Sequence, residues 1–156
     1  MTRSYWLFGN RFTVHANHED TAGRYDLIEG NPASGYQTPL HRHTRYAEQF
    51  YILEGEFTVW AGERKAVLHA GDVFTIPAGT AHVVAVTGRG PGRGLVVASP
   101  SGFARLIMGA GTPDTGARPP AELPDRALFD RICAEIGDEV LGPPGTRPGA
   151  RHLTNV

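Results

Sequence analysis

The chain has 156 residues, of which 40% are hydrophobic and 20% charged, proportions typical of one soluble globular domain. Its net charge of −1 gives no reason to expect a nucleic acid or an anionic membrane as partner. No apolar run approaches the roughly 18 residues that span a bilayer, and no signal-peptide pattern is found, so we expect a cytoplasmic protein. Cys133 is the single cysteine, which excludes an internal disulfide.

Short β-branched and aromatic runs follow one another along the first hundred residues, with glycine and proline between them. They predict about ten short strands, including one around 41–43. A tight turn at Gly9-Asn10 is expected to join the first two. The other runs are 4–8, 11–14, 24–30, 48–53, 57–60, 66–68, 73–76, 82–86 and 95–98.

Two helical patterns follow these runs, over 103–108 and 125–136. Many short strands with few helices predict an all-β fold, a jelly-roll β-sandwich or barrel with a short C-terminal helical segment. We expect residues 1–108 to form the barrel with its short terminal helix. Residues 109–156 are expected to form a connector, the C-terminal helix and a flexible tail.

The stretch from Gly35 to His82 contains the residues that suggest chemistry. His41 and His43 are two residues apart, so a strand would place both imidazoles on one face. Glu48 begins the next predicted strand and shares a face with Phe50 and Ile52. A carboxylate on an apolar face is costly to bury without a counter-charge, which a metal ion would supply.

His82 adds a third imidazole, at the start of a strand that follows the Pro77-Ala78-Gly79 turn. Three neutral imidazoles and one carboxylate suit one divalent transition metal ion, with positions left for water or substrate. Ligand type does not select among Fe, Mn, Ni, Cu and Zn. Calcium and magnesium are disfavoured because they prefer oxygen ligands.

The spacing of these residues resembles the two signatures of the cupin superfamily. In the first, Gly35 is followed after five residues by His41-x-His43, then after four by Glu48 and after six by Gly55. In the second, Gly71 is followed after five residues by Pro77-x-Gly79 and after two more by His82. The chain departs from the family at Val86, where asparagine is frequent. The resemblance extends more weakly to the N-terminal Tyr-Trp, to 96–103 and to the C-terminal helix, as in bacterial single-domain cupins related to quercetin dioxygenase.

The resemblance implies a metal site made of His41, His43, Glu48 and His82. It also implies that Glu48 can act as a general base, as the matching glutamate is held to do in quercetinase-like cupins. Around the site we expect an apolar substrate pocket with aromatic rims, which suits a flat aromatic or polyketide-like molecule. The predicted pocket residues are Tyr36, Tyr46, Phe50, Ile52, Trp60, Val84 and Val86.

The leading hypothesis is a metal-dependent dioxygenase that binds a flavonol-, catechol- or polyketide-like substrate at the ion and uses O₂. One alternative is a non-oxidative cyclase or isomerase, resembling cupin-type polyketide cyclases, in which the ion polarises a carbonyl group. Another is a non-catalytic cupin that binds a small molecule. Cupin relatives are commonly dimers, so a homodimer is expected.

Overall fold

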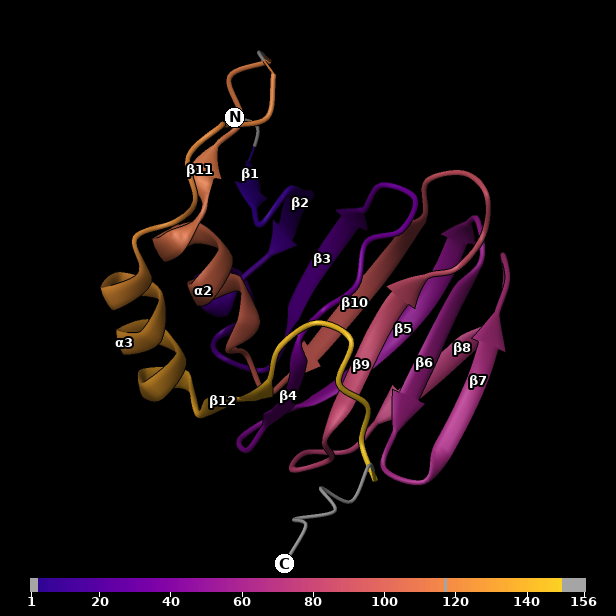
Figure 1. Cartoon of the computed structure of the whole chain (residues 1–156). Helices are drawn as coiled ribbons and strands as arrows, with labels where there is room; N and C mark the ends of the chain where they lie inside the picture. The colour runs from indigo at the N-terminus through magenta and orange to yellow at the C-terminus, as the bar shows by residue number, and fades with distance from the viewer. Residues whose placement is uncertain (1–2, 117, 150–156) are drawn as a thin grey trace, which may run out of the picture.

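Two antiparallel sheets face each other and enclose the core (Figure 1). The computed structural model describes residues 3–116 and 118–149, which contain twelve strands and three helices. The seven-stranded sheet has the order β11 (Thr112–Pro113), β1 (Ser4–Leu7), β2 (Asn10–Ala16), β3 (Asp26–Asn31), β10 (Arg93–Ser99), β5 (Ala47–Glu54) and β8 (Val73–Ile76). The five-stranded sheet has the order β12 (Asp138–Gly142), β4 (Leu40–His43), β9 (His82–Val86), β6 (Phe57–Ala61) and β7 (Arg64–Leu68).

The strands alternate between buried and more exposed residues, because successive side chains of a strand point to opposite faces. In β5, Glu48 and Ile52 are buried and Phe50 is half-buried, whereas Gln49 and Tyr51 are exposed. The inward side chains form two apolar clusters, one next to the helices and one between β5, β6 and β9, and Phe50 packs against both. The predicted all-β jelly roll with short helices is therefore confirmed.

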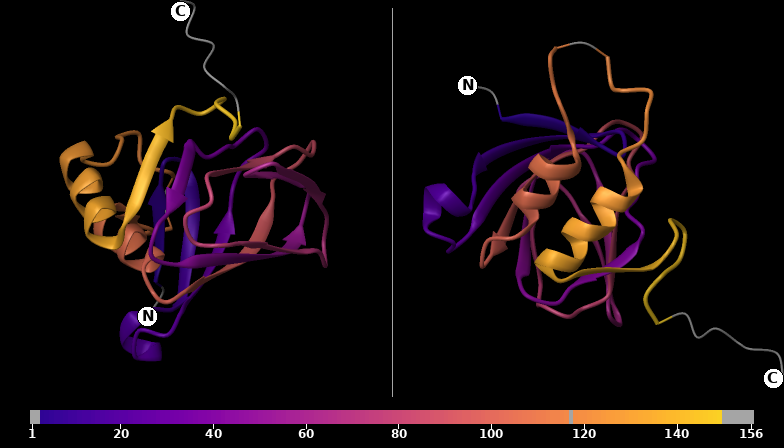
Figure 2. Two further views of the ribbon diagram at one scale, coloured as in Figure 1. Left: turned by 90° about the horizontal axis from the view of Figure 1, so that it is seen from below. Right: turned by 90° about the vertical axis from the view of Figure 1, so that its left-hand side faces the viewer.

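Helices α2 (Phe103–Ala110) and α3 (Arg126–Ile136) lie side by side at one edge of the molecule, as the two further views show (Figure 2). The short helix α1 (His18–Thr21) lies apart from them, next to β2. The buried carboxylate of Asp26 accepts hydrogen bonds from the backbone N–H groups of Gly102 and Ala104 at 2.8 and 3.0 Å, which satisfies the start of α2. No helix among residues 3–116 and 118–149 is long and apolar enough to cross a membrane.

A strand that the sequence analysis did not predict follows α3. The helix ends at Gly137, whose φ of 79° lies in the left-handed region, and the chain then runs along β4 as β12. In this register Asp138 pairs with His43 and Val140 with His41. The division of the chain at residue 108 stays a prediction, although β11 and β12 both join the sheets. Of the predicted flexible tail, residues 150–156 lie outside the described part of the chain.

Candidate metal centre

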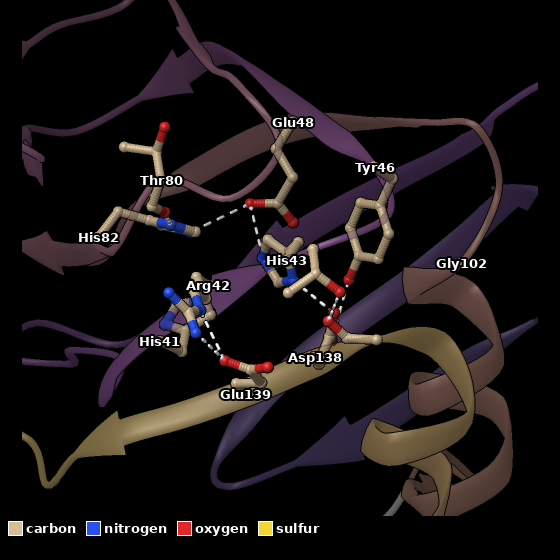
Figure 3. A network of polar contacts seen from close by, with 12 residues as sticks. His41, Arg42, His43, Tyr46, Glu48, Thr80, His82, Gly102, Asp138 and Glu139 are labelled. Carbon is tan, nitrogen blue, oxygen red and sulfur yellow. Dashed lines mark hydrogen bonds and ion pairs between the residues drawn. The ribbon is translucent and has the colours of Figure 1, made fainter.

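The three predicted histidines and Glu48 meet between the two sheets. His41 and His43 come from β4, and His82, the cross-strand partner of His41, begins β9. Glu48 comes from β5 in the opposite sheet. One ring nitrogen of each histidine lies within 4.8 Å of those of the other two. Oε2 of Glu48 lies 3.2 Å from Nε2 of His43 and 3.5 Å from Nε2 of His82 (Figure 3).

Each imidazole is oriented by an acceptor for its Nδ1 atom. His41 Nδ1 lies 2.8 Å from the carbonyl oxygen of Pro39, and His82 Nδ1 lies 2.8 Å from that of Thr80. His43 Nδ1 lies 2.7 Å from Oδ1 of Asp138. A proton on Nδ1 that is donated to each acceptor leaves the lone pair of Nε2 free to bind a metal.

Two of these Nε2 atoms, those of His43 and His82, are buried and have no hydrogen-bond partner among the residues that the structure describes. Buried polar atoms are normally hydrogen-bonded, so two orphaned atoms that face one carboxylate call for an explanation. A divalent cation would satisfy both, and its ligands would be the donor set that borderline transition metals prefer. The residues present therefore fit a bound metal ion.

The electrostatics of the metal-free cluster are set by burial and by the two carboxylates. Burial, together with the neighbouring His82 and His43, lowers the pKa of His41 from 6.5 to about 3, so this imidazole is neutral. Burial also lowers the pKa of His43, but Glu48 and Asp138 outweigh it and raise the value to about 10. Burial raises the pKa of Glu48, but the charge of His43 outweighs it and holds the value well below its usual range, so the carboxyl stays ionised.

Tyr46 and Asp138 support His43 from behind. The ring of Tyr46 stacks on the imidazole, with 4.5 Å between centroids and 23° between planes, and its hydroxyl donates to Oδ2 of Asp138 at 2.9 Å. Gly102 permits this position, since a Cβ there would lie 2.8 Å from Cδ1 of Tyr46 (Figure 3). Tyr46 was predicted as a pocket residue, and the structure places it beside His43 instead. Asp138 was not predicted.

An apolar cavity of about 100 Å³ opens beside His41, His43 and Glu48. A second cavity of about 100 Å³ adjoins it and shares part of its wall, including Tyr36, Phe12 and Phe103. The second cavity extends between the helices and β12. Of the predicted pocket residues, those that line the first cavity are Tyr36, Phe50, Ile52 and Val84.

Like Tyr46, the predicted pocket residues Trp60 and Val86 do not line either cavity. The ring of Trp60 lies under the guanidinium of Arg147, with 4.1 Å from the guanidinium carbon to the ring centroid. Val86 is buried in the apolar cluster between β5, β6 and β9, where it helps to fill the core.

Comparison with known proteins gives one family and one characterised relative. Residues 30–98 match the family described as the cupin domain. Over 123 residues, 79% of this chain, the sequence is 29% identical to quercetin 2,3-dioxygenase of Bacillus subtilis, and the match covers 36% of that enzyme. This chain therefore spans only about a third of the length of that relative.

Solved structures agree on the fold. An RmlC-like cupin from Shewanella frigidimarina has a TM-score of 0.55 at 24% identity, over 65% of this chain and 86% of the other. Oxalate decarboxylase of Lactobacillus farciminis has a TM-score of 0.57 at 20% identity, over 64% of this chain and 31% of the other. The fold and the two signatures are similar to those of the cupin superfamily, and residues 30–98 match its cupin domain. Among characterised proteins, the chain resembles quercetin 2,3-dioxygenase.

Proposed function

We propose that the chain is a metal-dependent dioxygenase that acts on a small hydroxylated aromatic molecule. The observation that carries the proposal is the pair of orphaned, buried Nε2 atoms on His43 and His82, which face the ionised Glu48. His43 and Glu48 also line an apolar cavity. The similarity to quercetin 2,3-dioxygenase supports the oxidative chemistry.

In this proposal His41, His43, Glu48 and His82 hold the ion. When bound, a divalent transition metal supplies a Lewis acid that lowers the pKa of a substrate hydroxyl and a site where O₂ can react. Glu48 is buried and ionised, so it can take the proton of that hydroxyl as a general base. Phe50 and Val84 would pack against the ring of the substrate and exclude water from it.

The size of the cavity favours a single substituted ring. Pockets for drug-sized ligands usually measure about 300–1,000 Å³, whereas each cavity here measures about 100 Å³. A catechol-like molecule would fit within the cavity next to His41. A flavonol or a polyketide would require the two cavities to join by movement of their shared wall, which includes Tyr36 and Phe103.

We also infer that the protein works as a cytoplasmic homodimer. The inference rests on the fact that cupins are commonly homodimers. Light scattering on the purified chain would test the oligomeric state. A mass of about twice 16.8 kDa is expected.

Metal content is the first test. We expect protein purified without added metal to contain about one transition metal ion per chain, as for other sites of this ligand type. His43→Ala should lose the ion. His69→Ala is the matched control, because His69 is an exposed histidine whose side chain pairs with Glu56, and the variant should keep full metal content. Absence of metal from the unaltered protein would refute the proposal.

Oxygen uptake is the second test. Metal-loaded protein should consume O₂ with a catechol in an oxygen electrode, and Glu48→Gln should consume far less at equal metal content. Substrate turnover that continues unchanged without oxygen would contradict the dioxygenase and favour the cyclase or isomerase. In that reaction Glu48 would move a proton beside the same ion.

A further inference from the structure

Asn10 is a buried polar residue in the wall of the substrate cavity, and the proposed metal site does not use it. The residue is only 4% exposed, and within residues 3–116 and 118–149 its Oδ1 atom has no hydrogen-bond partner. It is the first residue of β2, in the sheet that does not hold the histidines, and it lines the same cavity as His41, His43 and Glu48.

The hairpin between β1 and β2 does not explain this asparagine. The central residues of the turn are Phe8 and Gly9, with φ values of 48° and 77°, so Asn10 already belongs to the strand. Its side chain forms no hydrogen bond with the turn. Next along the inward face of β2 come Phe12 and Val14, which are both buried in the apolar core.

The cavity wall around Asn10 contains two hydroxyl groups, those of Tyr36 and Thr38. The Nδ2 atom of Asn10 lies near Gly30, since a Cβ atom added to that glycine would be 3.8 Å from it. Burial raises the pKa of the Tyr36 hydroxyl, and the neighbouring side chain of Asn10 lowers this pKa by a smaller amount. Thr38, another cavity residue, already accepts a hydrogen bond from the backbone N–H of Val84 at 3.0 Å. These contacts leave Oδ1 unsatisfied, which is costly for a buried carbonyl oxygen.

We propose that Asn10 is a second polar anchor for the ligand, whose Oδ1 atom accepts a hydrogen bond from a hydroxyl or N–H group on the ring. This inference rests on the proposed function, in which the opposite end of the ligand binds at the histidine cluster. The substrate would then be a small aromatic molecule that has a hydrogen-bond donor in addition to the two oxygens that bind at the ion. A ring without that donor would bury the amide oxygen unpaired and bind more weakly.

Two probes of nearly equal size test the proposal, 1,2,4-trihydroxybenzene and 4-methylcatechol. They differ by a hydroxyl in place of a methyl group, and both keep the catechol pair. Binding is measured by calorimetry without oxygen, on the full chain loaded with redox-inert zinc. The unaltered protein should bind the trihydroxy compound on the order of tenfold more tightly, the value of one hydrogen bond to a buried group.

Asn10→Leu keeps the approximate volume and removes the acceptor, so the preference between the probes should disappear. Asn10→Ala should do the same and serves if the leucine variant does not fold. Val84→Ala is the matched control, since it alters the same cavity without changing a polar group. This variant should weaken the binding of both probes equally and preserve the ratio of their affinities.

Equal affinities in the unaltered protein, or a preference that survives in both Asn10 variants, would overturn the role of Asn10. The proposed function would still stand if both probes bind in a zinc-dependent way. A zinc-loaded protein that binds neither probe would instead refute the aromatic ligand, and with it the ligand assigned to Asn10.

Discussion

Nδ1 of His43 lies 2.7 Å from Oδ1 of Asp138, a residue 95 positions later in the sequence. The pairing of β12 with β4 brings the two together, and Tyr46 donates a hydrogen bond to the other oxygen of the same carboxylate. The strand after the C-terminal helix therefore contributes to the candidate metal centre. A carboxylate behind a ligating imidazole fixes the orientation of the ring and makes it a stronger ligand.

Replacing Asp138 should weaken metal binding without removing any of the four proposed ligands. We expect Asp138→Ala to raise the dissociation constant for zinc by about 10- to 100-fold, the usual effect of losing such a partner. Asp138→Asn can still accept a hydrogen bond through its amide oxygen and should have an intermediate effect. Competition with a chromophoric chelator measures both constants.

Glu139→Gln is the matched control for these variants. Glu139 is the next residue of β12, but it is exposed and pairs with Arg42 on the outer face. Its replacement should leave the zinc affinity unchanged. Equal affinities of the Asp138→Ala and Glu139→Gln proteins would show that the carboxylate behind His43 does not tune the site.

The sequence was a better guide to the proposed metal ligands than to Asp138, the residue that orients one of them. His41, His43 and Glu48 could be placed because strand periodicity alone puts each of them on a definite face. Asp138 could not, because β12 is a short strand whose side chains are mostly exposed, and it has no apolar alternation. Only its pairing with β4 shows its position beside His43, and that contact is distant in the sequence.

Residues around the cavity were harder to predict for a different reason. A shift of one residue in a strand moves a side chain to the other face of the sheet. Trp60 was predicted as a pocket rim, but its neighbours Val59 and Ala61 take the inward positions of β6. Asn10 was predicted as part of a turn because asparagine after glycine is typical of tight turns, whereas it is the first inward residue of β2.

Metal binding should release a proton from His43. The pKa of this imidazole in the metal-free protein is about 10, so it is protonated at pH 7, whereas a ligating imidazole must be neutral. His41, with a pKa of about 3, is already neutral and releases none. Affinity for zinc should therefore rise as the pH increases from 7 towards 10. Calorimetry in buffers with different ionisation enthalpies counts the protons, and a release of zero would contradict the prediction.

The metal-free protein should be most stable near pH 6.5. His43 has a raised pKa in the folded state, so its contribution is fully present below 6.5 and is lost as the pH rises towards 10. His41 has a lowered pKa, so its contribution is present above 6.5 and is lost as the pH falls towards 3. Glu48 also has a lowered pKa in the folded state, so the protein loses further stability as the pH falls below 4.5.

Thermal unfolding followed by circular dichroism, in the presence of a chelator, measures this dependence. His43→Gln should flatten the alkaline side of the curve, because the titrating imidazole is gone. A midpoint that climbs steadily from pH 6.5 to pH 9 would contradict the assigned protonation of His43.

Filling the cavity should separate ligand binding from metal binding. Val84 lines the cavity from β9 but is no proposed ligand, and its side chain is half-buried. In Val84→Phe the larger ring would occupy much of a cavity of about 100 Å³, so zinc-dependent binding of 4-methylcatechol should weaken by at least about tenfold, as expected for an overpacked site. Zinc content should stay near that of the unaltered protein.

Val73→Phe, on an exposed position of β8, makes the same chemical change outside the cavity and should leave zinc content and catechol binding unchanged. If Val84→Phe binds the catechol normally, the ligand does not enter the cavity beside the histidines, since the added ring could not share that space with it.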